Sequence, residues 1–105
     1  MIVVSRFRVD AGDGEPFRAQ ARAALAALAA RPGYVDGRVG RNVDDPTLWL
    51  LTTWWENTGS YRRALSAYDV KVAAVPLLSR ALDEPSAYED VADGELNEPR
   101  PRERD

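Results

Sequence analysis

Three tryptophans and two tyrosines lie within one short stretch of the chain, LWLLTTWWENTGSYRRALSAY, at residues 48–68. Indole and phenol rings can wall an apolar pocket and offer a hydrogen bond to an aromatic ligand. A tyrosine hydroxyl can also act in acid–base chemistry. The stretch therefore predicts either a well-filled aromatic core or the wall of a pocket in which a ligand reacts.

The chain contains no histidine and no cysteine among its 105 residues. This excludes Ser–His–Asp triads, histidine-ligated metals, thiolate nucleophiles and zinc–thiolate sites made by this chain. A general acid or base must therefore be Asp, Glu, Tyr or the single lysine, Lys71. We predict no metal site and no cofactor.

Length and charge limit the partners. A chain of 105 residues has room for one core. Its 17 acidic and 14 basic residues give a net charge of −3, which argues against nucleic acid as a partner. The N-terminus lacks a basic segment followed by an apolar run, and no apolar run is long enough to span a membrane. We expect a cytoplasmic protein without a membrane partner.

The elements that must position the aromatic residues follow from periodicity. Apolar residues alternate with a period of two in four segments, which predicts strands. These segments are residues 2–9, 34–42, 48–56 and 85–91. Helical spacing predicts helices at 15–31 and across 58–82, where Pro76 marks a kink or a fresh start. Gly37 and Gly40 indicate a bulge in the second strand.

The order β-α-β-β-α-β is that of the ferredoxin-like α+β fold, an antiparallel sheet with its helices on one face. The strand at 48–56 is apolar on both faces, so its second face also needs cover. A second copy of the sheet would supply that cover and give a homodimer. The residues predicted for this interface are Ile2, Val4, Leu48, Leu50 and Trp54. Arg6 and Arg8 share that face, so we expect acids on the partner or a position at the sheet edge.

We predict one domain over residues 1–91. The segment 92–105 is charged, poor in apolar residues and contains two prolines, so we predict a disordered tail.

Two segments, RPGYVDGRV at 31–39 and DDPTLWLLTTWWENTGSYRRAL at 44–65, resemble the antibiotic biosynthesis monooxygenase domain of the dimeric α+β barrel superfamily. The first is similar to the family's Pro-Gly-aromatic start of the second strand. The second contains its Trp-Glu junction from the third strand into a helix. The resemblance implies the ferredoxin-like fold and a dimeric barrel, but the superfamily also includes members without monooxygenase activity.

Two branches of the family imply different chemistry. The haem-degrading branch uses an Asn on the first strand, the junction Trp and a His; Trp55 matches the Trp, while Ser5 and Ala64 stand at the other two positions. The cofactor-free branch oxidises polyketide-like phenols to quinones. Trp55 and Tyr61 match its Trp and Tyr, and Leu51 stands where it has an Asn.

The leading hypothesis is a homodimeric, cofactor-independent monooxygenase-like protein that oxidises or binds an aromatic, polyketide-like molecule between sheet and helices. Trp55 would wall the pocket and Tyr61 would orient or deprotonate the substrate, as the catalytic residues. Further substrate contacts are predicted at Ser5, Leu51, Trp49 and Tyr68. The alternative is a non-catalytic dimeric barrel that binds a small apolar ligand or supports a partner enzyme, with the aromatic residues as core. Haem binding is the third, least favoured hypothesis.

Overall fold

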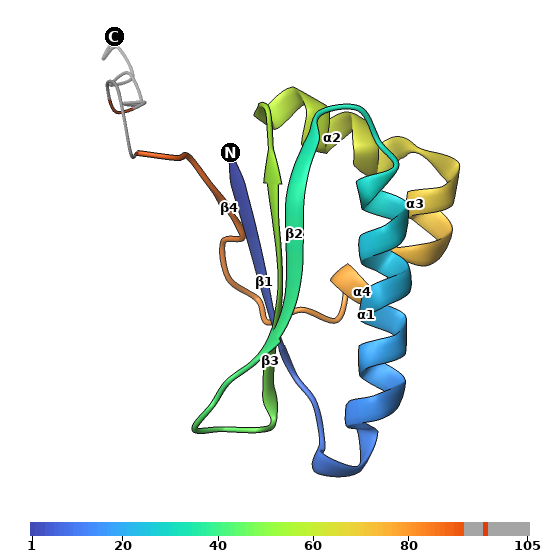
Figure 1. The fold of residues 1–105 in the computed structure, drawn as a ribbon, viewed down its shortest axis with the longest axis vertical. Helices are drawn as coiled ribbons and strands as arrows, with labels where there is room; N and C mark the ends of the chain where they lie inside the picture. Colours follow the sequence, from blue (N-terminus) through green and yellow to red (C-terminus); the bar gives the residue numbers. More distant parts are fainter. Residues whose placement is uncertain (92–95, 97–105) are drawn as a thin grey trace, which may run out of the picture.

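The computed structural model describes residues 1–91 and residue 96. A four-stranded antiparallel sheet carries all its helices on one face (Figure 1). The elements are β1 (Ile2–Arg8), a 3-10 turn (Ala11–Asp13), α1 (Gly14–Ala29), β2 (Tyr34–Arg41), β3 (Leu48–Trp55), α2 (Thr58–Ser66), α3 (Tyr68–Ala73), α4 (Val75–Leu78) and β4 (Ala87–Tyr88). The strand order β2-β3-β1-β4 confirms the ferredoxin-like α+β fold. Segments 92–95 and 97–105, which hold most of the predicted tail, lie outside the described residues.

The alternation of side chains divides the sheet as the sequence predicts. Every second residue of β3 is buried, and the residues between them are half-buried. The buried face packs on α1, where Phe17, Ala21, Ala24 and Leu28 are also buried. The five residues predicted for a dimer interface lie on the open face, which the helices leave uncovered (Figure 1).

Arg6 and Arg8 do not require the acidic residues that we expected on a partner, because both arginines form ion pairs within the chain. Arg6 binds Glu84 at 2.6 Å and Arg8 binds Asp45 at 2.7 Å. Neither arginine therefore brings an unpaired charge to the open face.

The bulge of β2 does not lie at its glycines. The register shifts between Tyr34 and Asp36, whereas Gly37 and Gly40 pair in register with Thr53 and Leu50. Gly37 serves close packing instead, because a Cβ there would fall 2.5 Å from the Leu25 side chain. The final strand is also shorter than predicted, with two residues in place of seven.

The helical spacing predicted across residues 58–82 would place Tyr68 on the same apolar face as Tyr61, and this is wrong beyond α2. Ala67 adopts an extended conformation (φ −70°, ψ 142°), which ends α2 and restarts the chain as α3. The restart changes which residues face the core, so Tyr68 is 78% exposed while Val70 is fully buried. Pro76 lies in the first turn of α4, where its missing N–H costs little, so it marks a fresh start.

Candidate functional site

The turn after α1 packs directly against the start of α2, and this contact determines the position of Tyr61. Gly33 has φ +88°, and a Cβ there would lie 2.3 Å from the Cβ of Ser60, so only glycine fits. The Asn57 side chain accepts a hydrogen bond from the Ser60 N–H at 2.8 Å and caps α2. Glu56 N–H donates to the Gly33 carbonyl at 2.8 Å. The Pro-Gly turn and the Trp-Glu junction therefore position one short helix.

Trp55 and Tyr61 meet as the spacing of six residues predicts. Their ring centroids lie 5.5 Å apart, and Tyr34 packs on the other side of Trp55, also at 5.5 Å. The Trp55 indole N–H donates to Thr53 Oγ1 at 2.8 Å in the core. Because that bond uses the only donor of the indole and the ring is 2% exposed, Trp55 cannot hydrogen-bond a ligand and instead supports Tyr61 from the core.

Tyr61, Ser5 and Leu51 line a small closed chamber beneath the helices, which Val3, Leu28, Thr53 and Leu78 complete. Its volume is about 10 Å³, enough for one water molecule. The chamber thus brings together Ser5, Leu51 and Tyr61, three of the predicted site residues, and Trp55 packs against Tyr61.

A larger outer cavity of about 540 Å³ opens beside the chamber, and the two share Ser5, Tyr61 and Leu78. We call the chamber and the outer cavity together the Tyr61 pocket. The outer wall is the segment 82–86, which is fastened to β1: Leu82 N–H donates to the Arg6 carbonyl at 2.8 Å, and Val4 N–H donates to the Ser86 carbonyl at 2.7 Å.

The polar groups of the Tyr61 pocket are an intact ion pair and a neutral phenol. Arg6 Nε and Nη2 donate to the two carboxylate oxygens of Glu84 at 2.7 and 2.6 Å. These hydrogen bonds lower the pKa of Glu84, which keeps it ionised. Burial raises the pKa of Tyr61 above its usual value of 10.0, so its hydroxyl remains protonated at neutral pH. Tyr61 is therefore a hydrogen-bond donor and not a base.

Three predicted site residues do not line this pocket. Trp55 is 2% exposed and packs against Tyr61 without bordering either cavity. Trp49 packs edge-on against Phe17 at 5.2 Å and borders a different groove. Tyr68 is exposed on α3 for the reason given above.

Sequence reasoning missed the residues that complete the outer cavity. Glu84 lies 78 positions from Arg6, and no local pattern links them. The one signal was Arg6 itself, a charged residue on an otherwise apolar strand face. Leu78 was predicted as an apolar helix position, but not as a pocket residue.

The site offers no metal centre within the described residues, where no group of three or more acidic side chains gathers. Ala64, at the position where the haem-degrading branch has its His, is a 1% exposed methyl group in the core. It cannot ligate iron, which leaves the phenols of Tyr61 and Tyr68 as the candidate ligands, and haem binding stays the least favoured hypothesis.

An antiparallel sheet with helices on one face and an aromatic-walled pocket between the layers defines an α+β protein of the ferredoxin-like class. The model of the family "Antibiotic biosynthesis monooxygenase" matches residues 1–74, and the chain belongs to this family. No curated protein gives a significant match. Among the described residues, no helix is both long and apolar enough to cross a membrane.

Solved structures share the fold. A variant of SnoaB, a cofactor-independent oxygenase from Streptomyces nogalater, superposes with a TM-score of 0.69 at 23% identity, covering 88% of this chain and 96% of that one. A protein from Deinococcus radiodurans assigned to the antibiotic biosynthesis monooxygenases gives a TM-score of 0.69 at 21% identity, with 92% and 97% covered. A conserved protein from Methanosarcina mazei Go1 gives 0.66 at 21%, with 82% and 84% covered.

Proposed function

We propose that the protein is a cofactor-independent monooxygenase that oxidises an electron-rich phenol or anthrone in the Tyr61 pocket. The observation that carries the proposal is Tyr61, packed against the buried Trp55, on the wall of a cavity large enough for a ligand of two or three rings. The fold shared with SnoaB and the family match support it.

The geometry assigns distinct roles. The chamber of about 10 Å³ is too small for an aromatic ring, so the substrate would lie in the outer cavity with its oxygen toward Tyr61. The protonated Tyr61 hydroxyl would donate a hydrogen bond to that oxygen and stabilise negative charge on it. Two carboxylates line the outer cavity, and because Arg6 holds Glu84 in its ionised form, Asp83 is the candidate for accepting the phenolic proton.

The reaction balances without a cofactor when dioxygen is the oxidant. The deprotonated ring carbon forms a bond to one oxygen atom of O₂, and the O–O bond then breaks. One oxygen atom becomes the new carbonyl, and the other leaves as water with the two hydrogens that the substrate loses. The protein contributes orientation, exclusion of water and a place for one proton.

The alternative is a non-catalytic barrel that binds a small apolar ligand. Two observations favour it: Leu51 presents no hydrogen bond to a ligand, and the closed chamber holds little more than one water molecule. In this alternative the Tyr61 pocket binds an aromatic molecule without changing it.

The Tyr61→Phe variant tests the proposal, because it keeps the ring and removes only the hydroxyl. Wild type and variant are assayed with anthrones and naphthols under air, without added cofactor. We expect the rate to fall by about 10²-fold or more, as for loss of a positioned proton donor. The free energy of unfolding should change by no more than ~1 kcal/mol, the value of one hydrogen bond.

Tyr68→Phe is the matched control, since it makes the same change on an exposed ring. It should leave both rate and stability unchanged. If wild type turns over none of these compounds while calorimetry shows that a naphthol binds, the non-catalytic alternative replaces the proposal.

We also propose that a second copy of the chain covers the open sheet face through Ile2, Val4, Leu48, Leu50 and Trp54. These apolar side chains are half-buried in one protomer, and apolar patches of this kind mark interfaces. Val4 also lines the Tyr61 pocket, so the interface would border the proposed site.

A further inference from the structure

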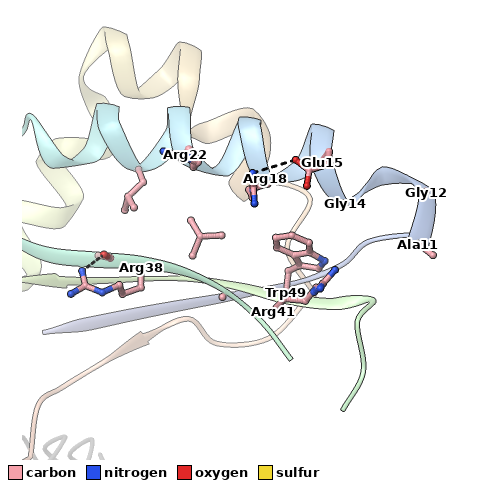
Figure 2. Close-up of a pocket in the computed structure, with 13 residues that line it drawn as sticks. Ala11, Gly12, Gly14, Glu15, Arg18, Arg22, Arg38, Arg41 and Trp49 are labelled. Atoms are coloured by element: carbon pink, nitrogen blue, oxygen red, sulfur yellow. Dashed lines mark hydrogen bonds and ion pairs between the residues drawn. The ribbon is translucent and has the colours of Figure 1, made fainter. Parts of the chain in front are cut away.

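A second, larger cavity lies between α1 and the edge strand β2, at the opposite edge of the sheet from the Tyr61 pocket (Figure 2). Its volume is about 650 Å³, within the range of sites that hold small organic ligands. One wall is the N-terminal half of α1, the other is β2, and the indole of Trp49 lies at one end (Figure 2). We call this cavity the arginine groove. The proposed oxidation makes no use of it.

Cationic side chains dominate the arginine groove. Arg18 and Arg22 lie four residues apart on one face of α1, and Arg41 enters from the opposite wall. The only acid of the lining is Glu15, which lies 3.5 Å from Arg18. Three arginines and one glutamate give the groove a local charge of +2, although the whole chain carries −3. The groove therefore attracts an anion even though the net charge of the whole chain is negative.

Arg38 also borders the groove but contributes little to this charge. It pairs with Thr52 in the sheet register, which places its side chain on the open face. There its guanidinium binds Asp36 at 2.6 Å and also donates to the Gly37 carbonyl at 2.8 Å, the bond that Figure 2 marks. The cations of the groove are thus Arg18, Arg22 and Arg41.

The floor of the arginine groove is flat and apolar. Leu25 and Val39 are half-buried from opposite walls, and Trp49 is 7% exposed. The guanidinium carbon of Arg41 lies 5.5 Å from the centroid of the Trp49 ring, so a planar cation already stacks on this indole. A flat apolar body fits the floor, while a charged group reaches the arginines.

The N-terminus of α1 adds to the positive electrostatic potential of the arginine groove. Its first turn lines the groove through Gly14 and Glu15, and the side chain of Asp13 makes no cap hydrogen bond. The positive end of a 16-residue helix therefore adds to the three guanidinium groups.

We propose that the arginine groove is a binding site for an aromatic carboxylate of about two or three rings. The carboxylate would bind Arg18 and Arg22, and the ring system would lie on Leu25, Val39 and Trp49. The inference does not depend on the proposed oxidation, because it concerns other residues and needs no chemical step.

Titration with 2-naphthoate followed by calorimetry and by the indole N–H resonances tests the inference. We expect saturable binding that shifts the Trp49 resonance more than that of Trp55, and that weakens as NaCl is raised from about 50 to about 500 mM. The neutral isostere 2-naphthamide should bind at least about tenfold more weakly, because it lacks the charge-assisted bonds.

The variant Arg18→Gln/Arg22→Gln removes the net positive charge of the groove while keeping good helix formers. It should weaken 2-naphthoate binding by at least about tenfold. The matched control is Arg62→Gln/Arg63→Gln, which removes two exposed helical arginines from α2 and should leave the affinity unchanged. Thermal melts of both variants confirm that they fold.

Three results would overturn the inference. One is the absence of saturable binding up to the solubility limit of 2-naphthoate. Another is an equal affinity of the groove variant and the control. The third is a shift confined to Trp55, which would place the ligand in the Tyr61 pocket. A failure of Tyr61→Phe to alter oxidation would bear only on the proposed oxidation.

Discussion

The Tyr61 pocket and the arginine groove are built from the same sheet and yet offer opposite electrostatics. Beside β1, the one cation of the Tyr61 pocket is matched by Glu84, and burial keeps the phenol neutral. Beside β2, three arginines share one exposed glutamate. Asp83 adds a second carboxylate to the Tyr61 pocket, so that pocket has no surplus cation and suits a neutral phenol, whereas the surplus cations of the groove suit an anion. One fold can therefore present two sites of different selectivity.

The largest effect is expected from Trp54→Glu, which should disrupt the proposed dimer and so affect the Tyr61 pocket but not the arginine groove. An unpaired carboxylate in an apolar interface costs about 3–5 kcal/mol, so sedimentation should show dissociation to a protomer of 11.6 kDa. The Tyr61 pocket borders the open face through Val4, so turnover should fall. Binding of 2-naphthoate should persist. Trp54→Phe, which keeps an apolar ring, should remain a dimer. A wild type that sediments as a stable monomer would contradict the dimer proposal.

A smaller contrast is expected from Leu51→Ala and Val39→Ala, which are direct partners across β2 and β3. Leu51 is 2% exposed under the closed chamber, so its truncation should cost about 2–5 kcal/mol of unfolding free energy. Val39 is half-buried in the open groove, so its truncation should cost only about 1 kcal/mol. Urea denaturation measures both. Equal losses would show that the two cavities do not differ in enclosure as described.

The smallest effect is a difference in acid titration between two exposed ion pairs. Hydrogen bonds from Thr47 and Arg8 lower the pKa of Asp45 to about 2, and those from Arg6 lower the pKa of Glu84. Because each folded pKa lies below the unfolded value, the stabilisation is complete above the unfolded value. It is lost as pH falls through the folded one.

Carbonyl-carbon NMR from pH 7 to about 1.5 follows both groups. The Asp45 resonance should titrate near 2, and that of Glu84 below its ordinary value of 4.5. A Glu84 titration at the ordinary value would show that its pair with Arg6 does not hold the wall of the Tyr61 pocket. The Asp45 pair, in the β2–β3 loop, serves as the comparison.

The sequence alone predicts the elements whose apolar residues recur at a regular local spacing. Alternation along β1 and β3 assigns each residue to a sheet face, because neighbouring side chains of a strand must point in opposite directions. The six-residue interval from Trp55 to Tyr61 is likewise local, since a strand end, a cap and the first turn of a helix fill it. The meeting of Trp55 and Tyr61 could therefore be predicted.

Tertiary structure decided what depends on distant segments or on a single backbone angle. The extended conformation of Ala67 places Tyr68 outside the core, and the hydrophobic periodicity of the sequence does not predict this break between helices. Glu84 reached Arg6 only because the chain after α4 returns along β1. Trp49 shares a strand face with Trp55, yet six residues of strand place them at opposite ends of the sheet. Local periodicity thus predicts most of the buried side chains of the strands, and the path of the chain decides exceptions such as Tyr68 and which side chains share a cavity.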